Sequence, residues 1–144
     1  MLNRVLPEQV SAAWDYYKEC IGAALPPYVE LNQQAMTNIL TAILLGKAVV
    51  WVYTIGREVH ATILTYVREH DLTRQKQLEI YAVYATEVVT PEKFKDALRV
   101  LQAYARSKGC QVIIGYSAEE EWVRYLSMMG ANVNFRLIEF NVEE

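Results

Sequence analysis

The spacing of apolar residues changes twice along the chain, and this change most constrains the fold. From Val10 to Leu44, apolar residues recur every three or four positions, which predicts helices. From Ala48 to Thr86, they run without a break or alternate with polar residues, which predicts three successive strands. Helical spacing returns after Thr90. Three consecutive strands between helical regions predict an α/β fold that contains an antiparallel meander.

Two helices are expected before the strands. The first begins at Pro7, because a proline in the first helical turn loses no hydrogen bond, and it ends before Pro26-Pro27. The second helix carries an apolar stripe and ends at Gly46, which is placed as a C-terminal glycine. We also expect a short strand at 2–6, ahead of both helices.

A helix is expected to connect the third meander strand to a further, short strand. Thr90, Pro91 and Glu92 combine a capping hydroxyl, a proline at the first helical position and an acid in the first turn. The helix ends at 108–109, and a short buried strand follows at 110–115. Because a crossover helix joins them, this strand is expected to run parallel to the third meander strand.

The C-terminal part predicts one more helix and one more strand. Ser117 and Glu120 have the spacing of a capping box, and the helix they open is expected to close at Gly130. The final strand is predicted at 133–142, with a phase change between Leu137 and Ile138 that predicts a bulge. The whole chain, 1–144, is therefore predicted to form a single α/β domain with a mixed sheet flanked by about four helices.

Composition restricts the class of protein. The 144 residues are 53% hydrophobic, which predicts a packed core, and the net charge of −3 does not favour nucleic-acid binding. No apolar signal segment follows the first residues, and the apolar stretch at 39–55 is interrupted and shorter than the about 20 residues of a membrane-spanning helix. The two cysteines, Cys20 and Cys110, have no metal-site spacing, so we expect buried thiols in a reducing, cytoplasmic compartment.

Two segments resemble a known family. Leu98–Cys110 (LRVLQAYARSKGC) is similar to the central helix and following strand of the GNAT (Gcn5-related N-acetyltransferase) superfamily. Trp122–Ala131 (WVRYLSMMGA) is similar to the last helix of that family. The predicted order of elements is also the family's order over the whole chain. The resemblance implies a GNAT-like fold and, for enzymes of the family, the use of acetyl-CoA.

The loop that holds the cofactor pyrophosphate in GNAT enzymes departs from the family pattern here. Those enzymes carry Gln or Arg, two residues, and then Gly-x-Gly or Gly-x-Ala, because glycine lets backbone N–H groups approach phosphate closely. This chain has Thr86–Lys93 instead, with no glycine, a proline that lacks N–H, and the acids Glu87 and Glu92. We therefore expect weak acyl-CoA binding. If acyl-CoA binds, the resemblance implies contacts from Val88, Val89, Thr90 and Lys93.

Candidate catalytic residues follow from the same resemblance. A general base would be a carboxylate on or after the third meander strand, either Glu79 or Glu87; the alternative is that Glu79 faces solvent or is paired at the strand surface. The family's proton-donating tyrosine falls on Leu126, and the adjacent Tyr125 should point about 100° away around the helix. Glu79 and Tyr125 are thus the catalytic candidates if the chain is an enzyme.

Other chemistry-bearing residues favour structural roles. His60 and His70 lie near Glu69 and Asp71, but they lack the spacing of a metal site, so we expect surface histidines and no metal. Ser117 has no nearby base and is expected to cap a helix. The ten tyrosines and three tryptophans exceed what a small interior needs, which favours a protein interface; the alternative is that half-buried tyrosines cover a thin core.

Two hypotheses of function remain. The pattern resembles small, divergent GNAT-like proteins of tailed phages. The favoured hypothesis is therefore a non-catalytic phage virion or assembly protein without a cofactor. It would act through protein contacts, with virion proteins or with itself, in the host cytoplasm or in the virion. No nucleic-acid or membrane partner is expected. The alternative is an N-acetyltransferase that uses acetyl-CoA with a remodelled pyrophosphate loop.

Overall fold

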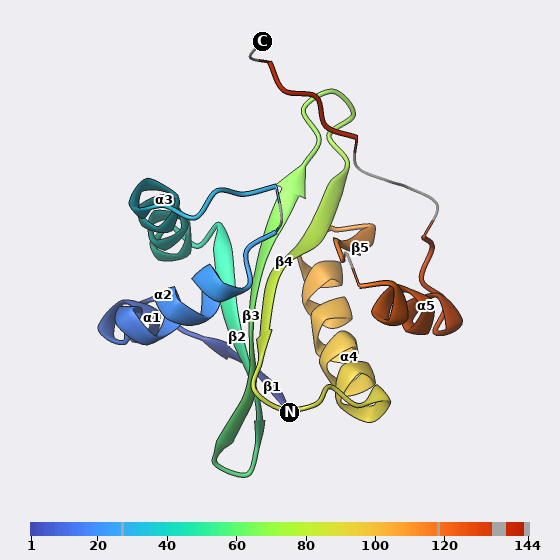
Figure 1. The fold of residues 1–144 in the computed structure, drawn as a ribbon, viewed down its shortest axis with the longest axis horizontal. Coiled ribbons are helices and arrows are strands. Elements are labelled where there is room, and N and C mark those ends of the chain that lie inside the picture. The colour runs from blue at the N-terminus through green and yellow to red at the C-terminus, as the bar shows by residue number, and fades with distance from the viewer. Residues whose placement is uncertain (27, 118, 134–137, 143–144) are drawn as a thin grey trace.

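The structure, a computed structural model, describes residues 1–26, 28–117, 119–133 and 138–142. In these residues, five strands form one sheet in the order β1-β2-β3-β4-β5, with helices on both faces (Figure 1). The elements in chain order are β1 (Leu2–Val5), α1 (Pro7–Ala12), α2 (Trp14–Ala23), α3 (Gln33–Leu44), β2 (Ala48–Ile55), β3 (Glu58–Glu69), β4 (Lys76–Ala85), α4 (Pro91–Ser107), β5 (Val112–Gly115) and α5 (Glu120–Met128).

The sheet is mixed, as the sequence predicts. Strands β1 to β4 pair antiparallel with their neighbours, and β5 pairs parallel to β4 after the crossover through α4. Helices α1, α2 and α3 lie on one side of the sheet, and α4 and α5 lie on the other (Figure 1). The α/β fold class with a meander and a parallel crossover is confirmed.

The first predicted helix is in fact two. Ala13 leaves the helical conformation, with φ −117° and ψ 34°, and separates α1 from α2. Its carbonyl accepts hydrogen bonds from the N–H groups of both Tyr16 and Tyr17, at 3.1 and 3.2 Å. The apolar spacing continues across the break, which is why the sequence pattern does not show it.

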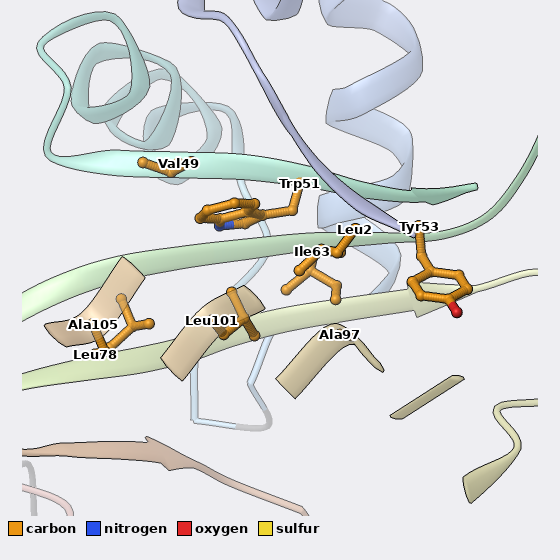
Figure 2. Packing of buried hydrophobic residues seen from close by; sticks show 9 residues of the cluster. All are labelled: Leu2, Val49, Trp51, Tyr53, Ile63, Leu78, Ala97, Leu101 and Ala105. Carbon is orange, nitrogen blue, oxygen red and sulfur yellow. The ribbon is translucent and has the colours of Figure 1, made fainter. Parts of the chain in front are cut away.

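One core lies between the sheet and α4. Leu78, which is completely buried, and Trp51 pack there against Leu101 of α4 (Figure 2). The Trp51 indole Nε1 donates a hydrogen bond of 2.9 Å to the hydroxyl of Thr65, which is also fully buried. This bond satisfies two polar groups that would otherwise destabilise the apolar layer.

A second core lies between the sheet and helices α1, α2 and α3. Val10, Met36 and Ile43 from the helices pack there against Val50 and Leu64 from the sheet. Strand β4 contains an irregularity at this face, because Thr65 pairs with Ile80 while Leu64 pairs with Ala82. The intervening Tyr81 is an extra residue on β4. Tyr81 and Ala82 therefore both pack on the side of α1, α2 and α3, which is also the side that Glu79 faces.

Local signals fix the ends of several helices. The Thr90 hydroxyl accepts a hydrogen bond from the N–H of Lys93 at 3.3 Å, as expected of a helix cap. Gly46 and Gly109 have φ of 77° and 74°, a left-handed conformation that favours glycine at a helix end. The predicted capping box is wrong, because α5 begins at Glu120 and the Ser117 hydroxyl accepts from the N–H of Glu119 at 3.2 Å instead.

The predicted final strand is only partly described. Residues 134–137 lie outside the described residues, and so does the bulge predicted at Leu137. Residues 138–142 are described and form no strand; their apolar side chains Ile138, Phe140 and Val142 are exposed. In the described part of the chain, no helix has both the length and the apolar character needed to cross a bilayer.

Candidate functional site

Glu79 is a fully buried acid near the middle of the sheet. It lies on β4 with 0% of its side chain exposed, opposite Tyr66 of β3 and beside Ile114 of β5. Its neighbours along β4, Leu78 and Ile80, pack toward α4, so alternation directs Glu79 toward α1, α2 and α3. The sequence alternative of a solvent-facing Glu79 is therefore not what the structure shows.

Arg68 pairs with this acid from the neighbouring strand. Its Nη1 atom lies 3.3 Å from Glu79 Oε1. The two side chains differ sharply in exposure, because 51% of Arg68 is exposed and none of Glu79 is. Within the described residues, the other carboxylate oxygen, Oε2, is buried and has no hydrogen-bond partner. One oxygen of a buried carboxylate thus remains free to bind or accept a proton.

Four tyrosines gather around the Glu79–Arg68 pair. Tyr66 and Tyr81 come from β3 and β4, and their ring centroids are 5.8 Å apart in an edge-to-face arrangement. Tyr28 lies between α2 and α3, Tyr116 follows β5, and their rings also meet edge to face at 5.6 Å. Tyr28 and Tyr116 are 40% and 45% exposed, so they form the outer part of the group. We call these six residues the Glu79 cluster.

Burial and the neighbouring charges shift the pKa values of several members of the cluster. Burial raises the pKa of Tyr28 from 10.0 to about 12, and the negative charge of Glu79 adds to this rise. Burial and then the Glu79 charge also raise the pKa of Tyr66 and of Tyr81. The Tyr116 hydroxyl, as a hydrogen-bond partner, raises the pKa of the Arg68 guanidinium. The phenols of Tyr28, Tyr66 and Tyr81 therefore stay protonated at neutral pH and are hydrogen-bond donors.

Strands β4 and β5 are paired over only part of β4. Their pairing runs from Gln77 and Val112 to Ile80 and Gly115. Strand β4 then continues to Ala85, beyond the end of β5. This part of β4 has an edge that faces no strand on the β5 side in the described residues. Such an edge presents backbone N–H and C=O groups to a ligand, and it lies directly after Glu79.

The loop between β4 and α4 is held by Lys93. The Lys93 Nζ atom donates to the Val88 carbonyl at 3.2 Å and lies 3.1 Å from His60 Nδ1. Val88 itself is exposed, whereas Val89 and Thr90 are half-buried. Thr90 uses its hydroxyl to cap α4, so it engages the N–H of Lys93 that could otherwise point at a phosphate. The four predicted contact residues thus lie in one short segment, 88–93, and Lys93 carries the only positive side-chain charge among the four.

Tyr125 lies in a separate aromatic group on the other side of the sheet. Its ring stacks on Trp122 of the same helix at 5.3 Å, and Trp122 meets Phe94 of α4 edge to face at 5.4 Å. The Tyr125 hydroxyl is buried and has no hydrogen-bond partner among the described residues. The structure records no contact between Tyr125 and Glu79. The two catalytic candidates thus lie in different layers.

The histidines have structural partners. His60 is largely buried, with 14% of its side chain exposed, and lies between Lys93 and Glu58; the expectation of a surface residue is wrong for it. His70 is exposed, and its Nδ1 accepts from the N–H groups of Leu72 and Thr73 at 3.2 and 3.3 Å. Across the described ranges, no group of three or more potential metal ligands is present.

Comparison with known proteins identifies the fold. A predicted acetyltransferase from Clostridium acetobutylicum, solved with acetyl-CoA, is 12% identical to the chain; the match covers 99% of this chain and 97% of that one, with a TM-score of 0.69. The chain has a GNAT-like fold. No protein-family model matches the sequence, and neither does any curated protein.

Two further solved structures share the GNAT-like fold along nearly their whole length. An aminoglycoside acetyltransferase from an uncultured soil metagenomic sample is 12% identical, with 99% of this chain and 98% of that chain covered and a TM-score of 0.68. Glucosamine-6-phosphate N-acetyltransferase from Arabidopsis thaliana is 16% identical, with 97% of each chain covered and a TM-score of 0.63. At these identities the likeness establishes the fold alone.

These comparisons correct the favoured hypothesis from the sequence. A non-catalytic phage virion or assembly protein is contradicted, because the solved structures that share the fold are acetyltransferases. They also give no support to the phage resemblance.

Sequence reasoning missed most of the Glu79 cluster. Arg68 was not singled out, and the tyrosines were interpreted as an interface or as cover for a thin core. A signal was present, because tyrosine excess and a lone acid inside an apolar strand both suggest a polar interior site. The sequence pattern could not show that Tyr28 and Tyr116, from distant segments, meet over Glu79.

Proposed function

We propose that the chain is an N-acetyltransferase that uses acetyl-CoA. The observation that carries the proposal is the Glu79 carboxylate, fully buried one residue before the pairing of β4 with β5 ends, with one oxygen that has no partner among the described residues. A buried carboxylate with a free oxygen is suited to accept a proton from an amine. The GNAT-like fold, shared with a structure solved with acetyl-CoA, supports the same function.

The residues present fit acetyl-CoA in two places. The edge of β4 beyond Ile80 offers backbone groups to the amides of the pantetheine arm. Lys93 supplies a positive charge beside Val88, Val89 and Thr90, where the pyrophosphate would lie at the N-terminus of α4. Because Pro91 lacks N–H and the loop has no glycine, we propose that Lys93 replaces part of the usual backbone cradle.

Two side chains, which lie in different layers of the fold, are the candidates for the proton transfers. Acetyl-CoA supplies the activated acetyl group, so that the new carbon–nitrogen bond forms as the carbon–sulfur bond breaks and CoA leaves as the thiol. An acceptor that arrives as an ammonium first loses one proton to solvent, and Glu79 Oε2 takes the second proton, which leaves the nitrogen as the carbon–nitrogen bond forms. The Tyr125 hydroxyl is the candidate donor of the proton that the thiol receives. Glu87 is the weaker candidate base, because its side chain is exposed in the loop after β4.

Calorimetry with acetyl-CoA tests this function. We expect binding with a Kd near 10 μM, about −7 kcal/mol, and CoA release when amines are added. Acetylpantetheine is the matched ligand without the pyrophosphate, and it should bind more weakly because it loses the contact with Lys93. Absence of acetyl-CoA binding at 1 mM, about −4 kcal/mol, would refute the proposed function.

A further inference from the structure

We infer that the acceptor amine is that of an α-amino acid, whose carboxylate is held by Arg68 while its nitrogen lies at Glu79 Oε2. This inference rests on the proposed function and names its substrate class. The basis is the position of a half-exposed guanidinium directly beside a buried carboxylate that has a free oxygen. The alternatives it excludes are polyamines, lysine side chains and peptide N-termini.

Arg68 has unused capacity for an anion. Only its Nη1 atom is within hydrogen-bond distance of Glu79, and half of the side chain is exposed. A guanidinium carries five N–H donors in a fixed planar fork, which matches a carboxylate through two parallel hydrogen bonds. Tyr116 takes part of this capacity, and the remaining exposed donors are available to a carboxylate that arrives from solvent.

The contact between the two residues favours a compact ligand. Arg68 and Glu79 touch through Nη1 and Oε1, 3.3 Å apart, so a molecule that hydrogen-bonds to both side chains fits best when its amine and its anion are within a few bonds of each other. An α-amino acid meets this condition, because both groups are bonded to one carbon. A polyamine or a lysine side chain would instead bring positive charge next to Arg68 with no anion to offset it.

The charges of the Glu79–Arg68 pair favour a zwitterion. Glu79 and Arg68 neutralise each other, so a ligand with no net charge enters without adding an unpaired charge to a buried site. The rings of Tyr66 and Tyr81 belong to the half-buried part of the Glu79 cluster and offer aromatic surface to the ligand side chain and to an ammonium group. Tyr28 and Tyr116, whose rings meet edge to face on connecting segments, form the exposed part of the Glu79 cluster.

Calorimetry on the wild-type chain without acetyl-CoA tests the substrate class directly. The probes are L-leucine, L-tyrosine and L-glutamate, each paired with its own α-methyl ester, which keeps the amine and removes the negative charge. We expect each free acid to bind at least tenfold more tightly than its ester. Equal binding, tighter binding of the esters, or no binding of either member of the pairs would overturn the inference.

A variant locates the effect at Arg68. Arg68→Gln should remove the preference for the free acid. Arg74→Gln is the matched control and should leave that preference unchanged, because Arg74 is an exposed arginine that pairs with Glu69 at 3.4 Å. If Arg68→Gln fails to fold, the ester comparison in the wild type still decides. A preference that survives in folded Arg68→Gln would overturn the role of Arg68.

Transfer assays separate this inference from the proposed function. Acetyl transfer to isoamylamine or spermidine at rates equal to or above those for L-leucine would refute the amino-acid class and leave acetyl transfer established. Failure to bind acetyl-CoA, together with at least tenfold selective binding of free amino acids, would refute acetyl transfer and support the Arg68 carboxylate site. Selective acetylation of L-leucine over isoamylamine, at least tenfold in kcat/KM, would support both.

Discussion

Arg68 Nη1 lies 3.3 Å from Glu79 Oε1, and this contact joins a half-exposed cation to a completely buried acid. Glu79 Oε1 is thus bound by the guanidinium, whereas Oε2 has no hydrogen-bond partner among the described residues. This geometry is typical of a functional site, because an unsatisfied buried oxygen costs free energy and would destabilise an ion pair whose only role was stability.

Glu79→Gln should reduce acetyl transfer about 100-fold, because an amide cannot accept the amine proton. The change conserves shape, and Arg68 can remain hydrated on its exposed side. We therefore expect the melting temperature to stay close to that of the wild type. Glu87→Gln is the matched control, in an exposed acid of the next loop, and should keep wild-type kcat/KM. Equal losses in the two variants would contradict the assignment of Glu79 as the base.

The tyrosines of the Glu79 cluster should ionise only at high pH. The unfolded chain releases a tyrosine proton near pH 10.0, whereas folded Tyr28 holds it to about 12. The folded state binds more protons in this interval, so stability is unaffected below pH 10 and falls as pH rises from 10 toward 12. Phenolate absorbance measured in native and denaturing buffer checks this.

The Glu79 charge contributes to that shift, after burial. In Glu79→Gln the native phenolate titration should therefore move to lower pH while remaining above that of the unfolded chain. An unchanged titration curve would show that Glu79 does not act on these phenols. Loss of the whole shift would show that burial is not its main cause.

Lys93→Ala should weaken acetyl-CoA binding about tenfold, the effect of losing about one charge-assisted hydrogen bond to phosphate. It should also loosen the loop, since Lys93 holds the Val88 carbonyl and lies against His60. Lys95→Ala removes an exposed lysine of the same helical turn and should change the Kd by less than about twofold. The two Kd values from calorimetry decide whether a specific lysine or general positive charge is needed.

Tyr125→Phe should lower kcat at least tenfold if this hydroxyl is the proton donor, a loss of about 1.4 kcal/mol. The same substitution should raise the stability of the fold. The hydroxyl is buried without a hydrogen-bond partner among the described residues, so its removal relieves an unsatisfied group. Thermal melting and steady-state kinetics on one preparation test both. Unchanged kcat in a stabilised variant would remove Tyr125 from the mechanism.

Trp51→Phe should destabilise the fold by about 1–3 kcal/mol, because the buried hydroxyl of Thr65 loses its 2.9 Å donor. Trp14→Phe is the control, in a half-buried residue of α2, and should cost less. Urea unfolding of both variants measures the difference. A smaller loss in Trp51→Phe than in Trp14→Phe would show that the Trp51–Thr65 bond does not stabilise the core.

Local signals predicted much of the fold, because each acts over a few residues. Thr90 and Pro91 begin α4, Gly46 ends the second long helix region, and strand β2 has the expected bounds. The break at Ala13 was not predicted, since the apolar spacing passes through it unchanged. Residues 138–142 have an alternating pattern typical of a strand but form none in the structure.

The sequence by itself determined the order and type of the elements, since periodicity, caps and glycines are local properties of the chain. It also placed Glu79 on a strand. Only the tertiary structure decided that this acid is buried, paired with Arg68 and close enough to Tyr28 and Tyr66 for its charge to raise their pKa values. The physical reason is that burial and charge pairing depend on which distant segments meet, and sheet register together with helix packing sets those contacts.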